Sequence, residues 1–169
     1  MAKPFILKPF IRKWEGGYCN NPNDKGGETK WGVTHTTYNS IYKGSVKNMT
    51  EEQWDYIFTT LYWDKCNADS IDNQNVANII VDWCWHSGVA KVKKKIQRLF
   101  GLVDDGVFGD KTLKVLNTNT KSVFNTIWNA RAKFFCDIVA NNPSQKVFYN
   151  GWMNRLNALK YNEQYCNTK

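Results

Sequence analysis

Apolar residues recur along most of this chain at spacings of three and four residues, the period of an α-helix, and few stretches alternate as a strand does. The pattern predicts longer helices over residues 4–14, 49–63, 75–87, 89–101, 120–140 and 143–159. Residues 102–116 predict a turn into a short helix with Asp110 as its N-cap. We therefore expect a mainly α fold.

The predicted helices differ in the faces that they bury. Residues 49–63 begin with Thr50 and Gln53 at the spacing of a capping box. Residues 75–87 are apolar almost all round, which is typical of a buried central helix. In residues 89–101 one face is apolar, and we expect the lysines of "KVKKK" on the solvated face. The expected inward positions of the helix over 120–140 are Val123, Ile127, Phe134 and Ile138.

The helical pattern stops after Trp14. Gly16 and Gly17 end the first helix, and the stretch to His35 is rich in Asn, Asp, Gly, Pro and Thr, the residues of turns. This composition predicts a small loop and hairpin region that ends near "TKWGVTH". The hairpin region follows the first helix directly, so Glu15 lies at their junction.

Glu15 is an unfavourable choice for a helix C-terminus, because the helix dipole is negative there. The aromatic neighbours Trp14 and Tyr18 would disfavour the charged form of a carboxyl group, as a general acid requires. Gly16 and Gly17 leave room for a substrate to approach. These features make Glu15 a candidate general acid.

A second acid, Asp24, follows in a polar loop, with Glu28 and Thr29 close behind it. Glycosidases use two carboxyl groups in unlike environments, one to protonate the leaving oxygen and one to activate water or attack. Asp24 and Thr29 fit such a site, although each also suits a turn. Both interpretations stay open at this point.

Composition narrows the class of ligand. The eight tryptophans and 15% aromatic content exceed ordinary core needs, and aromatic rings also line grooves that bind sugars. The net charge of +8 favours polyanions such as a bacterial envelope. Lysines greatly outnumber arginines, which disfavours nucleic acid as the partner.

Several other classes are disfavoured. The five cysteines are odd in number and form no C-x-x-C pattern, and the two histidines form no cluster, so we expect neither a disulfide framework nor a metal site. A Cys–His nucleophile pair has no flanking motif to support it.

The N-terminal apolar stretch is too short and too charged for a signal peptide, and no stretch reaches membrane-spanning length. We expect a monomer, made in the cytoplasm and not inserted in a membrane.

The motifs "WEGGY", "NDKGGETKWGVT", "DWCWHSG", "DDGVFGDKT" and "GWMNRL" follow one another in an order that resembles glycoside hydrolase family 108. The resemblance implies a lysozyme-like helical fold. Residues 1–75 would form a muramidase catalytic part, and residues 76–169 a peptidoglycan-binding-like part packed on it as one compact unit. These enzymes cleave the β-1,4 bond between N-acetylmuramic acid and N-acetylglucosamine in peptidoglycan, and need no cofactor.

The glutamate of the "EGGY" motif, the family's catalytic acid, falls on Glu15. Similarity in spacing to the T-even phage lysozymes extends catalytic roles to Asp24 and Thr29 and favours an inverting reaction. The family usually has proline where Lys25 stands, and asparagine where His86 stands. Our candidates for contact with the glycan strand are Tyr18, Trp31, Trp63, Asp82 and His86.

Three alternatives remain open. A non-catalytic secretion-accessory protein would bind the cell wall without cleaving it, and a lytic transglycosylase would use Glu15 alone. A basic nucleic-acid binder would show salt-dependent retention on DNA. A wall-cleaving protein without a signal peptide is expected to act after release or export, either as a phage endolysin or as a bacterial secretion activator.

Overall fold

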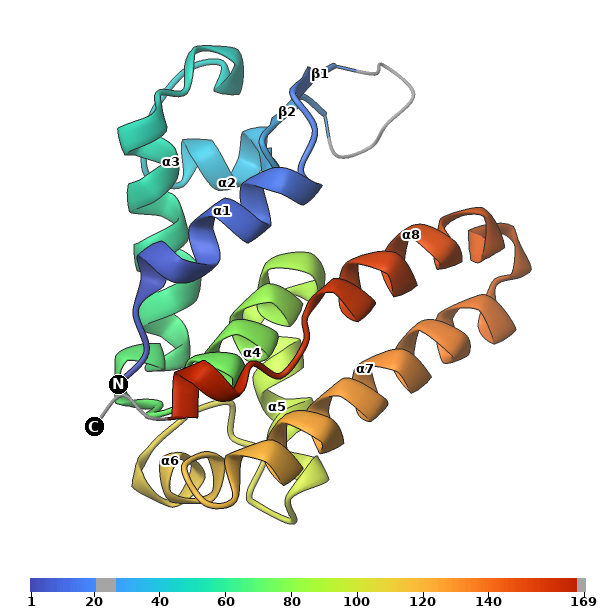
Figure 1. Cartoon of the computed structure of the whole chain (residues 1–169). Coiled ribbons are helices and arrows are strands. Elements are labelled where there is room, and N and C mark those ends of the chain that lie inside the picture. Colours follow the sequence, from blue (N-terminus) through green and yellow to red (C-terminus); the bar gives the residue numbers. More distant parts are fainter. Residues whose placement is uncertain (21–26, 167–169) are drawn as a thin grey trace. The chain divides into compact units, whose positions relative to one another are not determined.

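The computed structural model describes residues 1–20 and 27–166 (Figure 1). Over these residues the chain forms α-helices α1 to α8, short 3-10 and π turns, and one three-stranded sheet. The predicted mainly α fold is confirmed. The chain divides into two compact units: an N-terminal unit, Pro4–Asp64, and a C-terminal unit that combines Met1–Lys3 with Lys65–Lys169. Among the described residues, no helix is both long enough and apolar enough to cross a bilayer.

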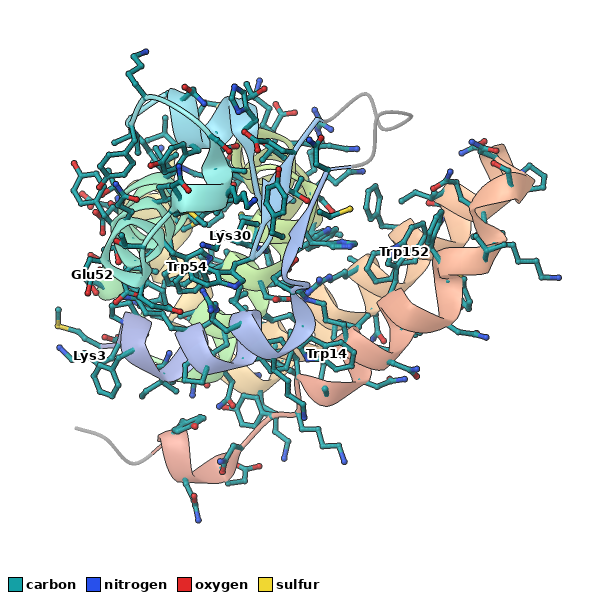
Figure 2. All side chains as sticks on the ribbon, turned by 90° about the horizontal axis from the view of Figure 1, so that it is seen from above. Lys3, Trp14, Lys30, Glu52, Trp54 and Trp152 are labelled. Carbon is teal, nitrogen blue, oxygen red and sulfur yellow. The ribbon has the colours of Figure 1, made fainter. Side chains whose placement is uncertain are left out.

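In its described residues, the N-terminal unit contains three helices and the sheet. Its elements are α1 (Pro4–Trp14), β1 (Tyr18–Cys19), β2 (Thr29–Lys30), β3 (Val33–Thr34), α2 (His35–Asn39), the 3-10 turn η1 (Val46–Asn48), α3 (Glu51–Phe58) and the π turn η2 (Thr59–Trp63). Its core joins Leu7 and Ile11 of α1 to Trp54 of α3, all at most 1% exposed. Figure 2 shows Trp54 inside this unit, where its indole stacks on Phe58 with a centroid distance of 5.5 Å.

Local signals set the limits of these elements. The Thr50 hydroxyl accepts a hydrogen bond from the Gln53 amide at 3.2 Å, and Gln53 Oε1 accepts one from the Thr50 amide at 3.0 Å. The predicted capping box is therefore confirmed. The predicted hairpin is also present, with β2 antiparallel to β1 and to β3. Helix α2 is missing from our sequence analysis, and its N-cap is Thr34.

The C-terminal unit is built on α4. Its elements are the 3-10 turn η4 (Ala68–Ser70), α4 (Gln74–Ser87), α5 (Val89–Leu99), α6 (Asp110–Leu116), α7 (Thr120–Asn141), η5 (Pro143–Gln145), α8 (Lys146–Ala158) and η6 (Glu163–Cys166). Helix α4 packs against α5 and α7, and the long helix α7 lies beside α8 (Figure 1). Nearly every residue of α4 is buried, which confirms the predicted central helix.

Three details of α5 and α6 correct the sequence analysis. Lys93, expected in solvent with the other lysines of "KVKKK", is buried and donates a hydrogen bond to the Lys65 carbonyl oxygen at 2.6 Å. Leu99, which helical spacing places on the expected apolar face of residues 89–101, is 40% exposed. The N-cap of α6 is Gly109 and not Asp110, which is the first helical residue.

The buried stripe of α7 also differs from the predicted one. Val123 and Ile127 are buried as predicted, but Phe134 and Ile138 are only half-buried. The buried positions in that part of the helix are Arg131 and Phe135. Arg131 is fully buried because its guanidinium pairs with Asp82 of α4, with Nη1 and Oδ2 2.7 Å apart. A charged residue thus occupies a core position that hydrophobic periodicity assigns to its neighbours.

Candidate active site

Glu15 follows the last residue of α1, and its side chain rests on the backbone of Gly32. A Cβ atom added to Gly32 would lie 2.7 Å from both Cδ and Oε2 of Glu15, which is closer than a side chain permits. Gly32 also has a φ of +78°, a left-handed conformation that favours glycine. The turn between β2 and β3 therefore needs glycine here for its own shape and to seat Glu15.

The same turn contains Trp31, which has a φ of +52° and is half-buried. Its backbone amide donates to the Gly16 carbonyl oxygen at 3.2 Å, so the turn is tied to the chain just after Glu15. Its carbonyl oxygen accepts from Trp54 Nε1 at 3.0 Å. The guanidinium carbon of Arg12 lies 3.7 Å from the centre of the Trp31 indole. These contacts connect α1, α3 and the β2–β3 turn around Glu15.

Glu28 is an acid beside the sheet that accepts several hydrogen bonds. Its carboxylate accepts hydrogen bonds from Ser45 Oγ at 2.7 Å, His35 Nδ1 at 2.7 Å, the Tyr18 hydroxyl at 2.9 Å and the Val46 amide at 3.2 Å. The bonds from Ser45, His35, Tyr18 and Val46 lower the pKa of Glu28 to about 2. Glu28 therefore stays ionised and links the sheet to α2 and η1.

Three other predicted site residues, Tyr18, Thr29 and Trp31, also belong to the N-terminal unit. Asp24 lies outside the described residues. Thr29 lies in β2, where it pairs with Cys19 and with Thr34. Tyr18 lies in β1 and is 40% exposed. Its hydrogen bond to Glu28 raises the pKa of the Tyr18 phenol. Tyr18, Thr29 and Trp31 are thus gathered on the strands and turn of one small sheet, with Glu15 in contact with that turn.

Trp63 and Asp82 do not reach the surface. Both are fully buried, so in this structure neither offers an atom to a glycan. Asp82 Oδ1 accepts a hydrogen bond from Arg155 Nη2 at 2.8 Å, in addition to the contact with Arg131 described above. Burial alone would raise the pKa of Asp82, but the two guanidinium groups hold it below its usual range. Its observed surroundings are those of a structural ion pair.

His86 lies near the C-terminus of α4 and is exposed. Its ring packs edge-on against Phe135, with centroids 5.8 Å apart, and against Trp152, with centroids 6.2 Å apart. Desolvation by its surroundings, and then repulsion by Arg131 and Arg155, lower the pKa of His86 to about 4. The imidazole is therefore neutral at physiological pH, within an aromatic cluster of the C-terminal unit.

The structure is that of a mainly helical protein in which an acid follows the first helix and contacts a small sheet. This arrangement is the one expected of the class of helical glycosidases. Residues 9–88 match the family model of glycosyl hydrolase 108, and residues 93–157 match that of a predicted peptidoglycan domain. The chain therefore carries a glycosyl hydrolase 108 domain followed by a predicted peptidoglycan domain, in agreement with the resemblance in its motifs.

The structure of Brucella abortus SagA is similar to this one, with a TM-score of 0.78 and 28% sequence identity, over 92% of this chain and 90% of that chain. No curated protein matches the sequence. Our sequence analysis places the end of the catalytic part at residue 75. The first compact unit ends at Asp64, and the glycosyl hydrolase match extends to residue 88.

Sequence reasoning missed two residues that shape the site. Gly32 was part of the "TKWGVTH" hairpin signal, but nothing in the sequence shows that its missing side chain makes room for Glu15. Glu28 was noted only as a neighbour of Asp24. Its four donors come from three separate parts of the chain, so no local pattern identifies it as a link between elements.

Proposed function

We propose that this protein is an N-acetylmuramidase, which hydrolyses the β-1,4 bond between N-acetylmuramic acid and N-acetylglucosamine in peptidoglycan. The glycosyl hydrolase 108 domain and the predicted peptidoglycan domain support a peptidoglycan-active glycosidase. The observation that carries the assignment to a residue is the contact of the Glu15 carboxyl group with Gly32. Gly32 adopts a conformation that favours glycine, and its missing side chain leaves room for this carboxyl group.

In the proposed reaction Glu15 donates a proton to the glycosidic oxygen as the bond breaks. Asp24 acts as the base, or stabilises the positive charge that develops on the sugar ring, and Thr29 positions the attacking water. Glu28 cannot take the role of proton donor near neutral pH, because its hydrogen bonds keep its pKa at about 2. Side chains and water supply both the proton and the nucleophile, so the reaction needs no cofactor.

The experiment is digestion of purified peptidoglycan sacculi by the whole chain and by two variants, followed by measurement of new reducing ends. Glu15→Gln should lower the rate at least about 100-fold, the usual contribution of a general acid. The matched control is Glu52→Gln, which makes the same chemical change at an exposed position of α3 and should keep the wild-type rate. Wild-type activity in Glu15→Gln would overturn the assignment.

Mass spectrometry of the released fragments separates the alternatives. Hydrolysis adds water and leaves a reducing N-acetylmuramic acid, whereas a transglycosylase leaves a 1,6-anhydro product that is lighter by one water. A protein that sediments with sacculi and releases no fragments would be a wall-binding protein without catalysis. Either of these results would reject the proposed hydrolysis.

A further inference from the structure

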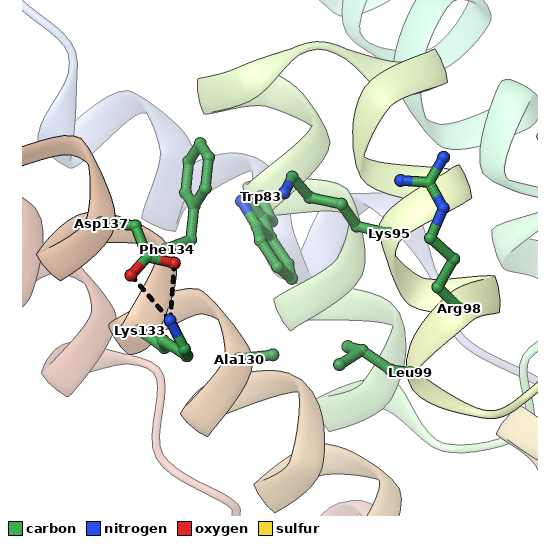
Figure 3. Close-up of a pocket in the computed structure, with 8 residues that line it drawn as sticks. All are labelled: Trp83, Lys95, Arg98, Leu99, Ala130, Lys133, Phe134 and Asp137. Carbon is green, nitrogen blue, oxygen red and sulfur yellow. Dashed lines mark hydrogen bonds and ion pairs between the residues drawn. The ribbon is translucent and has the colours of Figure 1, made fainter. Parts of the chain in front are cut away.

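A pocket of about 280 Å³ lies in the C-terminal unit between α4, α5 and α7 (Figure 3). Its apolar lining includes Trp83 of α4, Leu99 of α5 and Phe134 of α7. The rings of Trp83 and Phe134 are tilted against each other with centroids 5.9 Å apart. The pocket belongs to the region that matches the predicted peptidoglycan domain, apart from Trp83, and it takes no part in the proposed hydrolysis.

Three cationic side chains, Arg98, Lys133 and Lys95, line this pocket, and they differ in their partners. Arg98 is paired with Asp104. Lys133 Nζ contacts both carboxylate oxygens of Asp137, at 2.7 and 2.9 Å, as the dashed lines in Figure 3 show. Lys95 has no carboxylate partner among the described residues, and its Nζ lies 5.0 Å from the centre of the Phe134 ring.

A second lysine strengthens the positive charge at this ring. Lys91 Nζ lies 4.9 Å from the centre of Phe134, one helical turn before Lys95. Like charges four residues apart on a helix repel each other. An anion bound beside Phe134 would relieve this repulsion.

Trp83, which lines the pocket, also carries a buried hydrogen-bond donor without an acceptor. Trp83 is 1% exposed, and its indole N–H has no hydrogen-bond partner in the part of the chain that the structure describes. Buried donors of this kind are uncommon, because the group has lost its bond to water and gained none. Figure 3 shows the indole of Trp83 among Phe134, Lys95 and Leu99, so the side chains that carry this donor and the ammonium group of Lys95 line one pocket.

From this arrangement we infer that the pocket binds a carboxylate group carried on a small alkyl chain. The ammonium group of Lys95 would pair with the carboxylate and the Trp83 N–H would donate to one of its oxygens, while the alkyl part would lie on the apolar lining. A phosphate dianion is a poorer match, because the arginine and the other lysine that line the pocket already have carboxylate partners.

Given the proposed function, the source of such a carboxylate is the alanine-terminated peptide stem of peptidoglycan. Recognition of the stem would hold the wall polymer through a part of the substrate that the hydrolysed sugars do not provide. The inference thus extends the contact with substrate to the C-terminal unit.

The test uses the whole chain and the probe N-acetyl-D-alanyl-D-alanine, with its C-terminal amide as the uncharged comparison. Binding is followed by NMR through the indole N–H signals, among which the other tryptophans serve as internal references. We expect the acid to bind and to shift the Trp83 signal most, and the amide to bind at least about tenfold more weakly, as the loss of one charge-assisted hydrogen bond implies.

Lys95→Gln should weaken binding of the acid by a similar factor and leave binding of the amide unchanged. The matched control is Lys94→Gln, the neighbouring exposed lysine of α5, which does not line the pocket and should bind as the wild type does. Equal binding of acid and amide, no binding of either, or an equal loss in both variants would overturn the inference. Inorganic phosphate that displaces the acid at a lower concentration would overturn the preference for a carboxylate.

Failure of the proposed function gives a different result. Glu15→Gln should bind the probe as the wild type does, because the probe has no glycosidic bond. A wild-type protein that binds the acid but releases no fragments from sacculi would reject the muramidase assignment and retain this site. A protein that cleaves sacculi but does not bind the acid would reject the site and retain the muramidase.

Discussion

The contact between Glu15 and Gly32 makes Gly32→Ala the most direct test of the site geometry. A Cβ atom at this position would lie 2.7 Å from the Glu15 carboxyl group, whereas ordinary contacts of Cβ atoms begin at 3.4 Å. The carboxyl group must therefore move by the difference, about 0.7 Å, unless the turn itself shifts. The first response displaces the proposed proton donor, and the second changes the turn on which its side chain rests.

This substitution should have two effects, a loss of folding stability and a loss of catalytic rate, and the size of each can be stated separately. The left-handed backbone at Gly32, with a φ of +78°, should cost about 1–2 kcal/mol of folding free energy once a Cβ is present. A displacement approaching 1 Å at a catalytic group can lower the rate by about 100-fold. We expect Gly32→Ala to unfold at a lower denaturant concentration and to release reducing ends about 10- to 100-fold more slowly.

The matched control is Gly44→Ala in the same unit. Gly44 also has a left-handed φ, +108°, but a Cβ there would meet no atom within 4 Å. It should lose a similar amount of stability and keep its activity at temperatures where it is folded. Equal activity of the two variants under those conditions would refute the claim that the seat on Gly32 places the acid for catalysis.

Two further predictions concern stability. Because the pKa of Glu28 is lowered from 4.5 to about 2, its ionised form stabilises the folded state above about pH 4.5, and this contribution is lost as the pH falls towards 2. Glu28→Gln should therefore be less stable than the wild type near neutral pH, and the difference in stability should disappear in acid. Urea unfolding at several pH values would measure it, and a difference in stability that stays constant with pH would contradict the prediction. Asp82→Asn should cost about 3–5 kcal/mol in denaturant unfolding, because it leaves the buried Arg131 without its carboxylate. Asp137→Asn removes an exposed ion pair and should cost about 0.5 kcal/mol or less, so equal losses would count against the argument.

Hydrophobic periodicity predicts most helices of this chain because each buries one face, and that face recurs along the local sequence. It fails for Lys93 and Arg131 for a common reason. Lys93 is buried against a carbonyl oxygen 28 residues away, and Arg131 against a carboxylate 49 residues away. Burial of each of these charged side chains requires a polar partner that is distant in the sequence. The local pattern of apolar residues cannot show where that partner is.

In the candidate site, too, the sequence predicts what depends on neighbouring residues and fails for what depends on distant ones. Glu15 can be identified from the sequence because an acid at a helix C-terminus, followed by two glycines, is locally unfavourable. Trp63 and Asp82 look equally suited to a binding groove, but an aromatic or an acid can also serve in a core. Their full burial could be learned only from the packing of the whole chain.

Replacement of Glu28 and replacement of Glu15 should lower the rate of hydrolysis for different reasons. Glu28 accepts four hydrogen bonds that favour its charged form, so at neutral pH it holds no proton to donate. Any loss of rate in Glu28→Gln should therefore follow its loss of structure, and ought to recover under conditions that restore folding. The loss in Glu15→Gln should persist in a fully folded protein, because the missing group is then the proton donor itself. If instead folded Glu28→Gln were inactive and folded Glu15→Gln active, the two roles would have to be exchanged.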